Sequence, residues 1–227
     1  MKKTCAIIVL TVLIMFPIQG MAADANSAAD SNSKSAEIKS IDLPKPVMTG
    51  GKPLMEALKD RKSSREFSSE KLPLQVLSNL LWAANGINRE DGRRTAPTAM
   101  NKQEIDIYVV IEDGGFFYDP KANKLIEVAK GDLRGKTGMQ PFVKEAPVNL
   151  LFVADYEKME SMPPESREFY SATDTGFVSQ NVYLFCSSEG LATVVRGMVN
   201  RDECKAALKL REDQKVILAQ TVGYPIK

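Results

Sequence analysis

The chain has 227 residues, of which 44% are hydrophobic and 26% are charged, and its formal net charge is +1. This length and composition are typical of one globular domain, and the charge balance excludes the basic footprint of a nucleic-acid-binding protein. The chain has no histidine, which excludes a Ser-His-Asp triad, a histidine-ligated metal and a histidine general base. Any chemistry must come from other side chains, backbone groups or a bound cofactor.

The first 25 residues have the pattern of a secretory signal peptide. Lys2-Lys3 provide a positive start, residues 5–18 form an apolar run, and Ala23-Asp24-Ala25 matches a small-residue cleavage site. This leader has no twin arginine, so we expect Sec-type export. The pattern predicts a signal peptide over residues 1–25 and a mature protein that is periplasmic or extracellular.

Residues 26–42 separate the signal peptide from the rest of the chain. They are rich in Ser, Ala, Asn and Lys and cannot bury much apolar surface, so we predict a flexible linker. The folded domain is expected to span residues 43–227.

Two helices are predicted at the start of this domain. The first begins at Pro53, a favoured first-turn residue, and ends near Asp60. Leu54 and Leu58 lie one turn apart and predict its apolar face. A second helix, closed by Gly86 as its C-cap, is predicted from apolar residues at helical spacing: Leu74, Leu77, Leu81 and Ala84.

The stretch Arg61-Lys62-Ser63-Ser64-Arg65 combines three cations with two hydroxyls. In an extended segment, Arg61, Ser63 and Arg65 point to the same side. Guanidinium and hydroxyl donors in that arrangement suit a phosphate group. The alternative is an ordinary helix end, where cations interact well with the helix dipole.

Residues 95–103 have no apolar period. They offer small residues, hydroxyls and two amides, which suit close approach to a ligand and directed hydrogen bonds. On its own, this stretch fits an ordinary connecting loop equally well.

The middle of the chain predicts a sheet. Alternating apolar residues predict a strand over residues 105–111, and residues 116–118 and 125–128 predict a hairpin around a polar turn. Residues 131–142 predict a short helix or a lid over a site. The continuous apolar run 148–154 predicts a strand that is buried on both faces.

A long helix is predicted over residues 166–188. Small residues line it, namely Ala172, Gly176, Ser179 and Ser187. Such a face permits close helix packing, either in the core or across a dimer interface.

The C-terminal part predicts a short apolar strand over residues 192–195, a helix capped by Asn200 with Glu203 completing a capping box, and a final strand over residues 215–222. With the preceding elements, this order predicts an α+β fold with a mixed sheet. Cys186 and Cys204 fall on apolar faces of predicted helices, so we expect buried free thiols rather than a disulfide.

Taken together, these stretches resemble the FMN-dependent nitroreductase family over residues 43–225. The matching features are the basic stretch 61–65, the loop Pro97-Thr98-Ala99-Met100-Asn101-Lys102-Gln103, Glu189-Gly190-Leu191 after a long helix, and the closing Val222-Gly223-Tyr224-Pro225. Gly86 and Phe117-Tyr118-Asp119-Pro120 resemble the branch that contains azoline-forming dehydrogenases.

The resemblance implies a nitroreductase-like α+β domain over residues 43–227, with a mainly antiparallel sheet flanked by helices. It also implies a homodimer that binds FMN at the subunit interface, without a catalytic side chain or a metal. The implied phosphate and ribityl residues are Arg61, Lys62, Ser63 and Arg65, with Lys227 as a further phosphate ligand. The other subunit would supply Pro97, Thr98, Ala99 and Asn101, assisted by Gln103, and the flavin ring would meet Glu189 and Gly190.

Gly190 has two interpretations. Its missing Cβ would let the ring approach, or it merely caps the long helix.

Three functions fit these features. The first is an FMN-dependent oxidoreductase with ping-pong transfer to a small organic acceptor such as a nitroaromatic or a quinone. The second is an exported flavin-binding or redox-partner protein without turnover of its own, and the third is a surface protein that binds another phosphate ligand. NADH and NADPH are scarce outside the cytoplasm, so the resemblance leaves the electron donor open.

Overall fold

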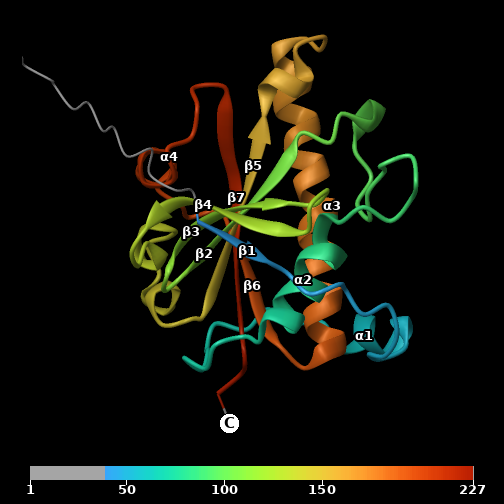
Figure 1. The fold of residues 1–227 in the computed structure, drawn as a ribbon, viewed down its shortest axis with the longest axis vertical. Helices are drawn as coiled ribbons and strands as arrows, with labels where there is room; N and C mark the ends of the chain where they lie inside the picture. Colours follow the sequence, from blue (N-terminus) through green and yellow to red (C-terminus); the bar gives the residue numbers. More distant parts are fainter. Residues whose placement is uncertain (1–38, 227) are drawn as a thin grey trace, which may run out of the picture. The chain divides into compact units, whose positions relative to one another are not determined.

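The computed structural model describes residues 39–226 (Figure 1). The predicted signal peptide, most of the predicted linker and Lys227 lie outside the described residues. The end of the predicted linker, Ser40–Asp42, forms strand β1 and pairs with β4. Among the described residues, no helix has the length and apolar character needed to cross a membrane.

A seven-stranded sheet forms the centre of the described domain, in the order β1-β4-β3-β2-β5-β7-β6. All pairings among the described strands are antiparallel, which confirms the α+β class and the mainly antiparallel sheet; the described sheet contains none of the parallel pairs that a mixed sheet would have. Strands β2, β3 and β4 form successive hairpins. On the other side of β2 lie β5, β7 and β6 in that order, each antiparallel to its neighbour. The strands after β1 are β2 (Ile105–Ile111), β3 (Gly114–Asp119), β4 (Lys124–Lys130), β5 (Val148–Asp155), β6 (Ala192–Arg196) and β7 (Gln214–Gly223).

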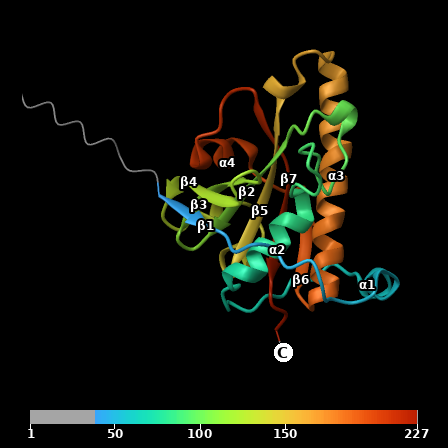
Figure 2. The same ribbon diagram turned by 45° about the vertical axis from the view of Figure 1, so that its right-hand side comes forward.

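Helices cover both faces of this sheet, as Figures 1 and 2 show. On one face, α2 (Leu74–Asn85) and α3 (Pro164–Glu189) pack on apolar side chains of β2 and β5. On the other face, α4 (Arg201–Leu208) packs on their alternate side chains. Every residue of β5 is therefore buried, as its continuous apolar run predicted.

The short helix α1 (Leu54–Asp60) has its predicted bounds but not its predicted face. Leu54 and Leu58 are 62% and 43% exposed, whereas Ala57 is buried. The helix contacts α3 through its backbone, because the Ser187 hydroxyl donates to the Ala57 carbonyl over 2.7 Å. A small residue is needed at this close contact, so the leucines face outward.

Gly86 ends α2 as predicted, but for a different reason. Its φ of −76° is open to any residue, so it is not a left-handed cap. A Cβ at this position would lie 2.4 Å from Cδ1 of Trp82. Glycine is therefore required by the Trp82 ring, which packs over the helix end and donates its Nε1–H to the Ile87 carbonyl.

Cys186 and Cys204 are both buried and free, as predicted. Cys186 belongs to the core under α3, and Cys204 belongs to the core under α4. The central sheet separates them, which excludes a disulfide between them.

Asn200 tests the local stability of α4. Its side chain accepts a hydrogen bond from the Glu203 amide over 3.2 Å. Asn200→Ala is expected to lower the free energy of unfolding by about 1 kcal/mol, measured by urea denaturation. Asn200→Asp keeps the acceptor and serves as the control. An alanine variant as stable as the parent would show that the cap contributes nothing.

Candidate functional site

A cavity of about 370 Å³ lies between the basic stretch 61–65, the C-terminal part of α3 and strand β6. It brings together two of the predicted clusters, because Lys62 and Gly190 both line it. The remaining polar lining includes side chains that were not predicted as site residues, namely Lys52, Ser64, Tyr183, Ser187 and Thr193.

Tyr183 of α3 fixes the position of the basic stretch. Its hydroxyl accepts a hydrogen bond from the Val195 amide over 3.0 Å, so its own proton is available to Ser63 Oγ, 2.8 Å away. The Arg61 guanidinium lies over the Tyr183 ring, 5.2 Å from its centroid, in cation–π geometry. The Ser64 amide donates to the Thr193 carbonyl over 2.9 Å, which attaches the stretch to β6.

Arg61, Ser63 and Arg65 were predicted to point together toward a phosphate, but the structure places a different set of side chains at the cavity. Arg61 and Ser63 both contact Tyr183, whereas Lys62 and Ser64 line the cavity. Arg65 is exposed. The alternation of the side chains was predictable, but which set faces the cavity depends on Tyr183, a residue distant in sequence.

The stretch carries positive charge without a matching acid. Within residues 39–226, Arg61, Lys62 and Arg65 form no ion pair with a carboxylate. Lys52 at the same cavity differs, because its ammonium lies 2.6 Å from Asp60. That hydrogen bond raises the pKa of Lys52 and lowers the pKa of Asp60. The excess charge of residues 61–65, beside serine hydroxyls, suits an anionic group such as a phosphate.

The C-terminal end of α3 forms another wall of the cavity. Gly190 is the C-cap, with a φ of +71° in the left-handed region, and its amide donates to the Cys186 carbonyl. The capping interpretation is therefore confirmed. A Cβ at Gly190 would meet no described atom within 4 Å, so the structure leaves open space at this helix end, and close approach of a ring stays a prediction.

A second, larger cavity of about 740 Å³ adjoins the first one. Glu189 and Thr95 line it, together with Trp82 and Asn181, and Lys52 contributes to both cavities. Successive residues at the end of α3 thus face different spaces, Glu189 the larger cavity and Gly190 the smaller one.

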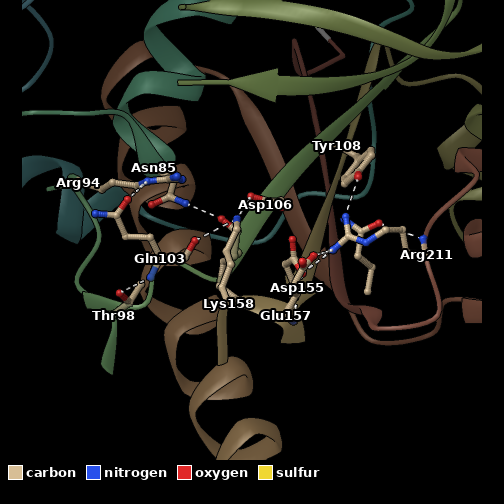
Figure 3. A network of polar contacts seen from close by, with 12 residues as sticks. Asn85, Arg94, Thr98, Gln103, Asp106, Tyr108, Asp155, Glu157, Lys158 and Arg211 are labelled. Atoms are coloured by element: carbon tan, nitrogen blue, oxygen red, sulfur yellow. Dashed lines mark hydrogen bonds and ion pairs between the residues drawn. The ribbon is translucent and has the colours of Figure 1, made fainter. Parts of the chain in front are cut away.

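The loop of residues 97–103 has a defined structure (Figure 3). The Ala99 amide donates to Oδ2 of Asp174 on α3 over 2.9 Å. The Gln103 amide donates to Thr98 Oγ1 over 3.0 Å, and Gln103 Oε1 accepts from Arg94 Nε over 3.1 Å. Three of its residues have positive φ, namely Met100, Asn101 and Gln103. The loop therefore has a fixed turn conformation, which hydrogen bonds to side chains hold in place.

Within one chain, this loop and the cavity do not meet. The loop attaches to α3 at Asp174, and the cavity begins at Tyr183, nine residues later. At 1.5 Å per residue this separation is about 14 Å along the helix. None of the predicted residues Pro97, Thr98, Ala99, Asn101 and Gln103 lines the cavity.

Some of the additional cavity residues had a sequence signal. Tyr183 and Ser187 are spaced by one helical turn just before Glu189-Gly190, which places both on the same face of the predicted helix. Thr193 and Lys52 had no such signal, because only the packing of β6 and of the segment before α1 brings them to the cavity.

Comparison with known proteins places this geometry in a family. Residues 58–224 match the nitroreductase family. The chain is 31% identical over 184 residues to a protein of Methanocaldococcus jannaschii named as a nitroreductase, covering 77% of this chain and 92% of that protein. A crystal structure from Ralstonia eutropha, also described as a nitroreductase, superposes with a TM-score of 0.79 at 46% identity, covering 83% of this chain and 90% of that one.

A more distant relative is the FMN reductase [NAD(P)H] of Bacillus subtilis. It is 23% identical over 186 residues, which cover 76% of this chain and 66% of that protein. The family match spans strands β2 to β7, α3, the basic stretch and the loop described above. The chain therefore belongs to the nitroreductase family.

Proposed function

We propose that this protein is an FMN-dependent oxidoreductase that passes electrons to a small organic acceptor, such as a nitroaromatic or a quinone. The observation that carries the proposal is the cavity of about 370 Å³ where the unmatched cations of residues 61–65 meet the open end of α3. Family membership supports oxidoreductase activity, and the name of the Bacillus subtilis relative supports the flavin.

The residues at the cavity fit the two ends of such a cofactor. Lys62 and the Ser64 hydroxyl are placed to bind the phosphate and the adjacent chain, and Arg65 is exposed close by in sequence. Glu189 and Gly190 are exposed, and a Cβ at Gly190 would meet no described atom, so a flat ring has room to approach this helix end. The expected contribution of Lys227 stays a prediction, because this residue lies outside the described part.

Bound FMN would supply the electron-transfer chemistry, and this chain would supply binding, orientation and electrostatics. Tyr183 holds Arg61 and Ser63 in place, so the basic stretch is positioned before a ligand arrives. Pre-positioned cations lose little freedom on binding and stabilise negative charge that develops on the bound group. No side-chain acid or base is required for this role.

We further propose that the protein is a homodimer with α3 at the interface. The outer face of α3 exposes Phe169 and Phe177, at 64% and 44%, with Ala172 and Gly176 between them. Two large apolar groups flanking small residues suit a second helix that packs closely. The other predicted small residues face inward, because Ser179 bonds Gln220 and Ser187 bonds the Ala57 carbonyl.

A dimer would also explain the separation of the two ligand-binding regions. The loop of residues 97–103 is about 14 Å along α3 from the cavity of its own chain. A two-fold axis near α3 would bring the partner's loop toward this cavity, which supports a site shared by two subunits. The proposal also includes Sec-type export to the periplasm or the cell exterior and a relationship to the azoline-forming branch, and it leaves the electron donor open.

The first test is the absorbance spectrum of the purified protein, with the released cofactor identified by mass. We expect flavin bands and the mass of FMN. The colour should bleach with a suitable donor and return with a nitroaromatic or quinone acceptor. Colour that bleaches but returns with neither acceptor would favour a redox partner without turnover. Colourless protein that cannot be loaded with FMN would contradict the proposal.

The phosphate assignment is tested by charge removal. Lys62→Ala and Arg65→Ala are each expected to weaken FMN binding by about 1.5–3 kcal/mol, the range for hydrogen bonds to charged groups, measured by quenching of flavin fluorescence. Lys59→Ala is the control, because Lys59 carries the same charge on α1, outside the basic stretch 61–65, and does not line the cavity. Equal losses in all three variants would mean that only general charge matters.

The dimer is tested on the outer face of α3. Phe177→Glu is expected to give a monomer in analytical ultracentrifugation at micromolar concentration, because it buries an unpaired charge at the interface. Ala206→Glu introduces the same charge at an exposed position of α4, on the opposite face of the sheet, and should leave the dimer intact. A Phe177→Glu variant that still sediments as a dimer would exclude this face.

A further inference from the structure

Two carboxyl groups lie buried beside each other beneath the loop of residues 97–103. Glu104 is fully buried just before β2, and Asp174 on α3 is 2% exposed. The Glu104 carbonyl accepts a hydrogen bond from the Asp155 amide over 2.9 Å, which fixes its backbone in the sheet. Among residues 39–226, neither side-chain oxygen of Glu104 receives a hydrogen bond from a donor.

The cations that face this pair are already engaged. Lys158 of the turn Tyr156–Met159 bonds Asp106 over 2.7 Å and the Gln103 carbonyl over 3.3 Å. Arg94, from the segment after α2, bonds Gln103. Figure 3 shows both side chains turned to these partners. Within the described part of the chain, Glu104 therefore has the Asp174 carboxyl as its neighbour and forms no ion pair with a cation.

Two adjacent buried carboxyls without a cation between them cannot both be ionised at low cost. Burial, together with the Asp174 carboxyl, raises the pKa of Glu104 to about 7, although Lys158 opposes this shift. One proton can serve both groups, because protonated Glu104 becomes a donor and Asp174 an acceptor. Asp174 Oδ2 then stays in place to accept the Ala99 amide.

We propose that Glu104 is a positioning residue of the cofactor site: it shares one proton with Asp174 and so holds the loop 97–103 through the Asp174–Ala99 hydrogen bond. This Asp174–Ala99 hydrogen bond is the anchor of the loop. The loop depends on it because Met100, Asn101 and Gln103 all occupy the left-handed region, which is unfavourable for residues with a side chain. When the proton is lost, the two carboxylates repel each other and the anchor weakens.

The direction of the pH dependence follows from proton binding. Free glutamate has an ordinary pKa of 4.5 and folded Glu104 has one of about 7, so the folded protein holds the extra proton between these values. The contribution to stability is fully present below pH 4.5 and is lost as the pH rises through 7. Anchoring of the loop is therefore expected to weaken from pH 6 to pH 8.

This inference rests on the proposed function only where it assigns the loop to cofactor binding. The anchor itself can be measured without flavin, by hydrogen–deuterium exchange of the Ala99 amide in the full protein. After correction for intrinsic exchange, its protection is expected to fall about tenfold between pH 6 and pH 8. In Glu104→Gln, which keeps a neutral donor beside Asp174, protection should not change with pH.

Asp155→Asn is the matched control, because it removes a buried carboxyl that pairs with Arg211 and leaves Lys158 on Asp106. This variant should keep the pH dependence of the parent. Flat protection of Ala99 in the parent, or an unchanged pH dependence in Glu104→Gln, would overturn the inference. If Glu104→Gln does not fold, titration of the Glu104 carboxyl by ¹³C NMR in the parent replaces it, and an apparent pKa near 4.5 would overturn the inference.

The affinity for FMN, measured over the same pH range, separates the inference from the proposed function. Affinity that falls toward pH 8 in the parent but not in Glu104→Gln supports both. A pH-dependent anchor in a protein that binds no FMN would support the carboxyl pair and contradict the flavin. FMN binding in a protein whose Ala99 protection does not change with pH would support the flavin and contradict the carboxyl pair.

Discussion

The packing of α3 against α2 and the centre of the sheet is the constraint on which the cavity at residues 61–65 and the loop of residues 97–103 both depend. Asp174, halfway along this helix, holds the loop of residues 97–103. Tyr183, further along, holds the basic stretch, and Gly190 ends the helix at the cavity. A rigid helix in a close-packed core sets the spacing between these points. The same helix positions the cavity and the loop and exposes Phe169 and Phe177 on its outer face.

The basic stretch 61–65 and the buried carboxyls of Glu104 and Asp174 carry their charge in opposite environments. The cations of residues 61–65 lie at the surface, where water stabilises them at little cost, and no described carboxylate neutralises them. They can therefore attract an anion and exchange water for it. Glu104 and Asp174 are buried, where an isolated charge is costly and a shared proton is the cheaper state. The first arrangement suits binding of a ligand, and the second suits control of a loop by pH.

Much of the secondary structure could be predicted from local patterns, because burial and helix capping both leave their marks in neighbouring residues. The run 148–154 predicted a strand buried on both faces, and Asn200 predicted a helix start, and both are confirmed. Two details failed for tertiary reasons. The close contact between Ala57 and Ser187 turned the leucines of α1 outward, and the ring of Trp82, rather than a left-handed backbone, made glycine necessary at residue 86.

The sequence by itself determined the class of the fold, the order of the elements and the chemical types available, since periodicity and composition are properties of the local chain. It also determined that chemistry here proceeds without histidine. Only the tertiary structure decided that Lys62 and Ser64, rather than Arg61 and Ser63, line the cavity, and that Glu104 lies beside Asp174. These pairings join residues far apart in sequence, and no local pattern encodes them, because the packing of α3 on the sheet creates both neighbourhoods.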